Sequence, residues 1–191
     1  MKKTLISGIS ILALSAFTIL GGTWKNDPAH SQLGFTVTHL GVSEVSGTFN
    51  DFEIVANASK ADFSDASFEL SAKAASIDTR VEMRDNHLKS PDFFEAEKYP
   101  TLNFKSTSLK KAGNNNYKLA GNLTIHGVTK PVTMDLSYNG TVENPMSKKP
   151  TAGFTLAGTI KRSDFALGSK FPAPMISDEV KIQASGEFTQ N

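Results

Sequence analysis

The side chains that most often carry out chemistry are few and scattered in this sequence. The four histidines, His30, His39, His87 and His126, show no His-x-His or His-x-x-x-His spacing that would gather them around a metal. The chain has no cysteine, so it has neither a thiol nucleophile nor a disulfide framework. It also lacks the Gly-x-Ser-x-Gly nucleophile motif and a glycine-rich phosphate-binding loop. We therefore predict no catalytic residues and no metal ligands.

One stretch, residues 85–106, interrupts an otherwise strand-like pattern. Ser90 fits the N-cap of a helix and Pro91 its first position, while Pro100 ends the segment because the residue before a proline avoids the helical region. Three aromatic residues fall within the stretch: Phe93, Phe94 and Tyr99. We interpret it as a short helical plug or lid, with helical character starting near residue 78.

Most of the chain after residue 23 alternates between apolar and polar residues with a period of two, which indicates β-strands. Each expected strand has one apolar and one polar face, so the sheet cannot be buried on both sides. A sandwich or a closed barrel satisfies that pattern. We expect about eight antiparallel strands, over residues 33–39, 45–54, 68–74, 102–104, 117–125, 132–138, 154–160 and 180–188.

The apolar faces carry small residues among large aromatic ones. An eight-stranded barrel either just fills with side chains or holds one small ligand. Small residues favour a hollow interior, but the phenylalanines could instead fill the space that the glycines leave, and the sequence leaves both readings open. The small residues are Gly47, Ala72, Ala74, Gly121, Gly158, Ala184 and Gly186.

The first 22 of the 191 residues resemble an export signal, with Lys2 and Lys3 followed by an uncharged, mostly apolar run. The alternative is a membrane anchor, but the run is short and diluted by Ser, Gly and Thr. Cleavage would leave residues 23–191 as one domain with 18 basic and 19 acidic side chains. A charge so close to neutral, without a basic run, argues against nucleic acid as a partner.

Several motifs, in order along the chain, resemble those of the YceI-like family of bacterial secreted or periplasmic polyisoprenoid-binding proteins. The opening motifs are Trp24–Ser31, Phe35–His39 and Gly47–Phe49. The later ones are Arg84–Leu88 with Phe93–Phe94 and Lys98–Pro100, then Leu123–Pro131, Arg162–Phe165 and Asp178–Ile182. Together they span residues 24–188. Each motif alone would be weak, whereas the ordered set is specific.

The resemblance implies an all-β fold, an extended lipocalin-like eight-stranded antiparallel barrel with a short helical insertion between strands. It implies a long-chain isoprenoid or another lipid as partner, such as a bound polyisoprenoid or quinone-like molecule, and neither a cofactor nor catalysis. It also implies a periplasmic protein with no permanent membrane anchor after signal cleavage. Whether the chain forms a homodimer stays open.

On this interpretation, apolar side chains line the bore and a few polar ones meet the ligand's head group. We expect the bore to be lined by Phe35, Phe49, Phe68, Leu70, Phe93, Phe94, Tyr99, Phe104, Leu123, Phe154, Ile160, Phe165 and Ile182. The head-group candidates are Arg84, His87, His126, Lys130 and Arg162. Other roles stay open: an Arg84–Asp85 ion pair, a turn contact for His126, and plain solvation for Lys130 and Arg162.

Two rival functions predict different interiors. An enzyme or metal protein acting on a small molecule predicts a short cavity where histidines or carboxylates converge. A filled barrel acting as a stress or interaction protein predicts no cavity, and an exposed apolar patch instead.

Overall fold

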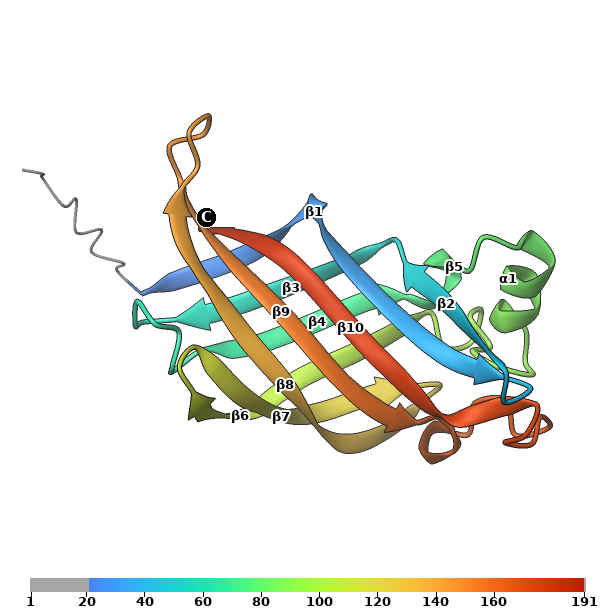
Figure 1. The fold of residues 1–191 in the computed structure, drawn as a ribbon. Helices are drawn as coiled ribbons and strands as arrows, with labels where there is room; N and C mark the ends of the chain where they lie inside the picture. Colours follow the sequence, from blue (N-terminus) through green and yellow to red (C-terminus); the bar gives the residue numbers. More distant parts are fainter. Residues whose placement is uncertain (1–20, 191) are drawn as a thin grey trace, which may run out of the picture.

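The computed structural model describes residues 21–190, and within this range the predicted fold class is confirmed. The strands close into an eight-stranded antiparallel barrel with one short α-helix (Figure 1). Residues 1–20 of the expected export signal lie outside the described residues. Among residues 21–190, no helix is both long enough and apolar enough to cross a membrane.

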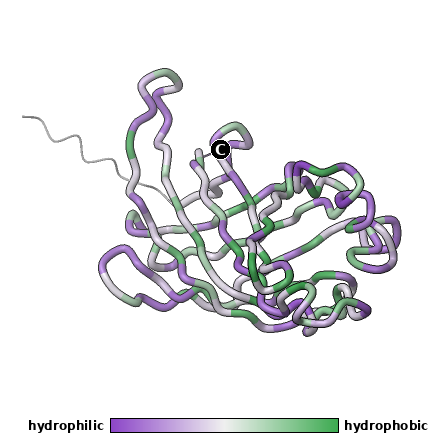
Figure 2. The backbone as a smooth tube through the Cα atoms, turned by 45° about the vertical axis from the view of Figure 1, so that its right-hand side comes forward, coloured by the Kyte–Doolittle hydropathy of each residue, from purple (hydrophilic) through white to green (hydrophobic). Residues whose placement is uncertain are grey.

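The chain forms ten strands, several of them longer than the sequence indicates, because their polar ends carry no clear alternation. The strands are β1 (Gly22–His39), β2 (Ser43–Phe49), β3 (Phe52–Ala58), β4 (Ser67–Lys73), β5 (Ile77–Asp78), β6 (Thr101–Gly113), β7 (Asn116–Ile125), β8 (Val128–Glu143), β9 (Pro150–Lys161) and β10 (Ile176–Gln190). The helical elements are η1 (Ala74–Ser76), α1 (Glu82–Lys89) and η2 (Arg162–Phe165). Hydropathy changes from residue to residue along the strands, as two-faced strands require (Figure 2).

Strand β1 closes the barrel. One edge of β1 pairs with β10 from Trp24 to His39. Its other edge pairs with β3 near the N-terminus and with β2 further along. Strands β2 and β3 therefore act as one interrupted strand of the wall, and β5 only extends the edge beside β2. This explains how ten strands build an eight-stranded barrel.

A bulge in β1 changes which of its residues face inward. The pairing with β10 shifts between Asn26 and Ser31, and the intervening residues leave the ladder. Asp27 stabilises the bulge, because its Oδ1 accepts a hydrogen bond from the Ala29 N–H at 2.9 Å and its Oδ2 lies 2.8 Å from His30 Nδ1. The same hydrogen bond raises the pKa of His30.

An aromatic cluster closes one end of the barrel. Phe63, in the turn between β3 and β4, is almost fully buried and packs edge-on against Trp24 and Phe154, with ring centres 5.1 and 5.0 Å apart. The Tyr117 hydroxyl donates a hydrogen bond to the Asp62 carbonyl at 2.7 Å, which holds that turn in place. The aromatic cluster therefore closes this end of the barrel, and the end near α1 lies opposite it.

The predicted helical interruption is present and, as expected, begins soon after residue 78, with α1 starting at Glu82, but the predicted N-cap at Ser90 is wrong. Helix α1 ends at Lys89, and Ser90 adopts extended backbone with φ −75° and ψ 170°. Pro91 explains this, because its ring disfavours helical backbone in the residue before it. Residues 91–99 continue as turns beside the open end of the barrel. The stretch contributes to a lid as expected, although most of it is not helical.

Candidate functional site

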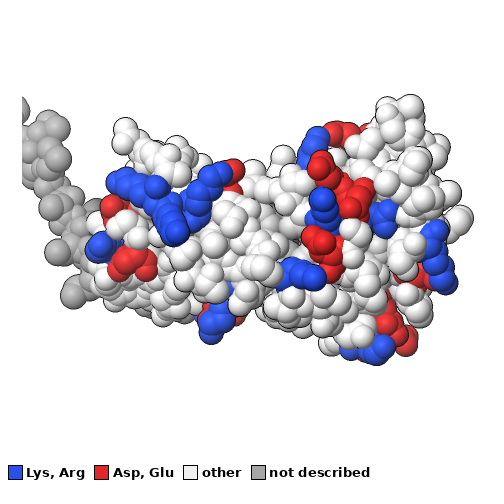
Figure 3. All heavy atoms as spheres, turned by 90° about the horizontal axis from the view of Figure 1, so that it is seen from below, with Lys and Arg blue, Asp and Glu red and all other residues white. Residues whose placement is uncertain are grey.

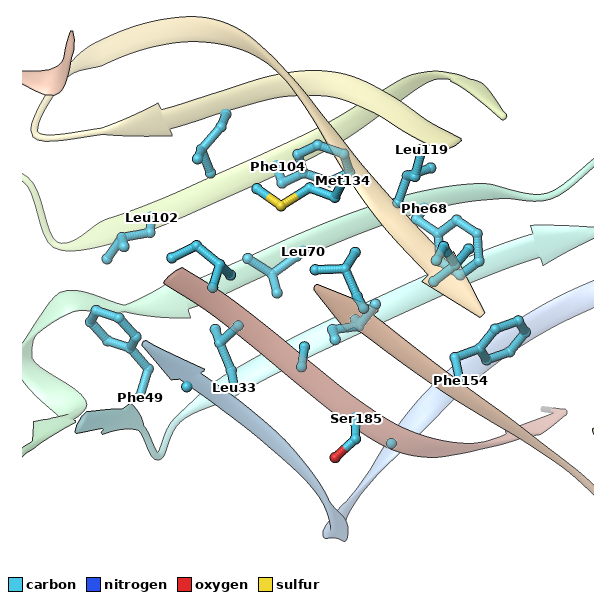
Figure 4. Close-up of a pocket in the computed structure, with 18 of the residues that line it drawn as sticks. Leu33, Phe49, Phe68, Leu70, Leu102, Phe104, Leu119, Met134, Phe154 and Ser185 are labelled. Carbon is cyan, nitrogen blue, oxygen red and sulfur yellow. The ribbon is translucent and has the colours of Figure 1, made fainter. Parts of the chain in front are cut away.

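The inner half of the barrel holds an apolar cavity of about 130 Å³. Inward side chains of the strands line it, and Figure 4 shows almost only hydrocarbon, with the Met134 sulfur and the Ser185 hydroxyl as exceptions among the labelled residues. The predicted bore residues found here are Phe35, Phe49, Phe68, Leu70, Phe104, Leu123, Phe154, Ile160 and Ile182. This cavity lies next to the closed end, since Phe154 also belongs to the aromatic cluster there.

A second cavity, of about 360 Å³, adjoins the first and extends to the open end. The two share a waist of six residues: Phe35, Phe49, Leu102, Ile125, Ile160 and Ile182. Helix α1 borders the outer cavity, as does the segment of turns at residues 91–99, which we call the lid. The lid carries the predicted bore residues Phe93 and Phe94, which line this cavity. The two adjoining cavities, which together we call the tunnel, show that the interior of the barrel is not filled with side chains.

Two predicted bore residues, Tyr99 and Phe165, do not line the tunnel. Phe165 is buried in the surrounding core, 1 % exposed. The Tyr99 ring lies over Gly127, where a Cβ would come within 2.5 Å of it, and edge-on to His126 at 4.8 Å. These aromatic residues therefore brace the wall and the lid from outside the bore.

The glycines of the apolar faces do not by themselves create the cavity. A Cβ on Gly47 would meet the Phe35 ring at 2.6 Å, and one on Gly121 would meet the Phe104 ring at 2.4 Å. The space left by Gly158 is taken by the Met134 side chain in the same way. Large side chains thus fill the space beside these glycines, which is one of the two possibilities that the sequence leaves open, yet the barrel also keeps a cavity. Ala184 does line the cavity.

Arg162 is a structural residue and not a free head-group ligand, although it borders the outer cavity. It is 7 % exposed, and its Nε donates a hydrogen bond to the Ser177 carbonyl. Its Nη1 and Nη2 donate four more bonds, to the carbonyls of Leu167, Gly168, Phe171 and Ile176. All its nitrogens are therefore occupied in shaping the loop between η2 and β10. Solvation, the alternative left by the sequence, is also wrong for this side chain.

Arg84 and Asp85 both bind Thr79, and within residues 21–190 they form no ion pair with each other. The Arg84 Nε and Nη2 donate to the Thr79 hydroxyl and carbonyl at 2.8 Å. The buried Asp85 accepts hydrogen bonds from the Thr79 N–H at 2.8 Å and from its hydroxyl at 2.5 Å. These contacts fix α1 to the end of β5. Arg84 borders the outer cavity, but two of its three nitrogens already have partners.

His87 is the head-group candidate best placed at the tunnel opening. It borders the outer cavity and packs edge-on against Phe93 and Phe171, whose own rings stack 5.0 Å apart. Its Nε2 lies 3.3 Å from Asp92 Oδ2, and Lys170 donates to the other oxygen of Asp92. The hydrogen bond from Lys170 lowers the pKa of Asp92, with His87 contributing. These contacts join the two loops that cover the opening.

The other two head-group candidates lie away from the tunnel. Lys130 is exposed on β8 and borders neither cavity. His126 has positive φ at the turn between β7 and β8, and its Nε2 lies 3.4 Å from Glu95 Oε2. The two groups are close but make no hydrogen bond, and the imidazole packs against the Tyr99 ring. The turn role considered for His126 fits this placement.

Sequence reasoning missed most of the outer rim of the tunnel. His39, which looks like a core residue because it follows Phe35 and Val37 in alternation, is exposed at the opening. Val45, Phe171 and Met175 also border the outer cavity. Alternation could have identified Val45, but the loop carrying Phe171 and Met175 has no periodic signal.

Within residues 21–190, one group of metal-ligand types comes together: Asp27, His30 and Glu187. It lies at the β1 bulge, and none of its members borders either cavity. The Asp27–His30 hydrogen bond already accounts for two of the three as supports of the bulge. The cluster is therefore explained by the local fold.

Comparison with known proteins identifies the family. Residues 24–188 match the family model described as "YceI-like domain". The protein named UPF0312 protein SAS2572, from Staphylococcus aureus strain MSSA476, is 35% identical over 167 residues, covering 85% of this chain and 95% of its own. The crystal structure of the Campylobacter jejuni YceI protein is 33% identical, with a TM-score of 0.74, over 81% of this chain and 90% of that one.

A third similarity concerns the fold alone. A polyisoprenoid binding domain from Saccharophagus degradans, implicated in plant cell wall breakdown, aligns with a TM-score of 0.66 at 15% identity. The alignment covers 90% of this chain and 99% of that domain. From the family model and the 35% identical relative, we conclude that the chain belongs to the YceI-like family.

Proposed function

We propose that this member of the YceI-like family binds a long-chain isoprenoid or similar lipid in its tunnel and carries or stores it without chemical change. One observation carries the proposal: an apolar tunnel that is closed by an aromatic cluster at one end and reaches a lid at the other. A long, narrow, apolar and blind cavity suits a linear hydrocarbon chain entering tail first.

Burial of the chain supplies enough free energy without a specific polar contact. Each CH₂ group that leaves water contributes about 0.8 kcal/mol. A tail of ~20 carbons would yield on the order of 15 kcal/mol before the costs of association and ordering. Most of the affinity would therefore come from the wall residues, and the head group would mainly fix which end remains outside.

The polar groups at the opening favour an uncharged head group. A phosphate is usually bound by a free arginine fork, but all nitrogens of Arg162 bind backbone carbonyls. Arg84 keeps only Nη1 unbonded among its nitrogens in the described structure, and Lys170 is paired with Asp92. We therefore favour an alcohol or quinone-like head group over an isoprenyl phosphate.

We also propose that the protein acts in the periplasm and as a binding protein. The expected export signal in residues 1–22 supports a periplasmic location. The polyisoprenoid binding domain from Saccharophagus degradans has the same fold, which supports the ligand class by analogy. Within the described residues, the histidines and carboxylates do not converge on the tunnel as an enzyme acting on a small molecule would require.

The choice of head group is tested by isothermal titration of the delipidated mature protein with two ligands of equal tail length, geranylgeraniol and geranylgeranyl diphosphate. We expect the alcohol to bind at least as tightly as the diphosphate, because no free arginine fork compensates the desolvation of the phosphates. Tighter binding of the diphosphate by about tenfold or more, 1.4 kcal/mol, would overturn the uncharged head group. Binding of neither would overturn the ligand class.

A further inference from the structure

Large apolar side chains lie exposed around the open end of the tunnel. Val42 is 84% exposed and Leu40 57%, both in the turn between β1 and β2, and Met175, 43% exposed, lies in the loop before β10. We call Leu40, Val42 and Met175 the apolar rim. Met83, 83% exposed on α1, lies at the same end of the barrel (Figure 1). Exposed apolar residues gathered in one place commonly mark an interaction surface.

The turn that carries the rim does not favour these residues for its own stability. Leu40 and Gly41 have φ of 52° and 72°, and the Val42 N–H donates to the His39 carbonyl at 3.1 Å. Two central residues with positive φ define the hairpin turn that usually contains Asn-Gly or Asp-Gly. A leucine in this left-handed conformation is strained, and here its side chain is also exposed to water. Local folding therefore does not explain Leu40.

The rim is continuous with the tunnel. The Leu40 N–H donates to the Met175 carbonyl at 3.0 Å, which holds the turn against the loop before β10. Met175 also borders the outer cavity, together with Val45 on the same hairpin as Leu40. A lipid leaving the outer cavity would thus pass from the tunnel wall directly onto the exposed apolar rim.

The charges near the opening point to an uncharged partner surface. Lys181 is paired with Glu44 on the same hairpin, and Lys170 with Asp92 in the lid. On the face shown in Figure 3, basic and acidic side chains are mixed at this end of the molecule. A specific protein partner would need about 800 Å² of surface, whereas the rim is a few side chains on separate loop tips. Such tips suit shallow insertion into a lipid layer.

We infer that the apolar rim docks the protein on a lipid bilayer, with Leu40, Val42 and Met175 inserted among the lipids and the tunnel opening facing the membrane. This inference rests on the proposed function, because docking gives a lipid in the tunnel a path to the bilayer that avoids water. The docked carrier would exchange its ligand directly with the bilayer.

Flotation with neutral phosphatidylcholine vesicles tests the inference. We compare the mature protein with the double variant Leu40→Asn and Val42→Thr, in which Asn also suits the turn. The matched control is Val142→Thr with Met146→Ser on the β8–β9 hairpin. As a pair, these two side chains are more exposed than Leu40 and Val42, but the hairpin lies at the opposite end of the barrel (Figure 1). We expect the rim variant to lose about tenfold or more in vesicle binding and the control to lose none.

Salt and ligand measurements separate the possible failures. Vesicle binding should persist at high salt, because insertion of apolar side chains is not screened. Both variants should bind geranylgeraniol in solution as the parent does. Equal flotation of the rim variant and the parent, absence of parent flotation, or equal loss in the control would each overturn the docking surface. Failure of the parent protein to bind geranylgeraniol would instead contradict the proposed function.

Discussion

The substitution Ala184→Phe is expected to weaken lipid binding strongly while the barrel stays folded. Ala184 lies on β10 between Leu33 and Leu156 of the neighbouring strands and lines the inner cavity. A benzyl group here would occupy much of a cavity of about 130 Å³ and block the tail. Excluding even four CH₂ groups would cost about 3 kcal/mol of affinity, on the order of 100-fold.

The matched control for this substitution is Ala157→Phe. Ala157 lies on β9, exposed on the outer face, and pairs with Gln183, the residue next to Ala184. It adds the same side chain to the same part of the sheet but outside the tunnel. Calorimetric titration should show unchanged geranylgeraniol affinity in the control and an affinity lower by on the order of 100-fold in Ala184→Phe, while circular dichroism shows strands in both. Undiminished binding by Ala184→Phe would show that the inner cavity does not hold the lipid tail.

The substitution Arg162→Met is expected to lower the free energy of unfolding by about 3 kcal/mol, because it leaves buried carbonyls of the loop before β10 without donors. The methionine fills much of the same volume, so the loss would report hydrogen bonds more than packing. Urea denaturation followed by circular dichroism measures the change. Arg162→Lys should retain part of the stability, since its ammonium reaches fewer of the carbonyls.

The two interpretations of Arg162 give opposite results. If Arg162 is a structural residue, its replacement should lower stability strongly and leave the relative affinities of the alcohol and the diphosphate unchanged. As a head-group ligand, its replacement would lower affinity for the diphosphate alone, with unfolding almost unchanged. That second pattern would restore the phosphate-binding role that the sequence first indicated.

Alternation indicates which side chains of a strand share a face. Side chains two residues apart share a face of a strand, so Phe68 with Leu70 could be placed in the bore without any knowledge of pairing. The bulge at residues 27–30 was harder, because it shifts the inward face from Trp24 and Asn26 to Leu33 and Phe35. No periodic pattern in the sequence indicates such a shift.

The residues that shape the opening depend on contacts between distant segments. Arg162 resembles an isolated charge at a strand end, and only the folded loop shows the carbonyls that surround it. Phe165 and Tyr99 have the residue type expected of a bore but lie outside it, because loops and turns carry no fixed side-chain direction. The space beside glycines such as Gly158 likewise depends on which cross-strand side chain covers them.

Native mass spectrometry of the mature protein purified from its own cells tests the central claim most directly. We expect a discrete added mass that organic extraction releases and that is an isoprenoid or similar long-chain lipid with an uncharged head group. A bare protein mass that gains nothing when isoprenoids are offered would show that the protein is not a lipid carrier.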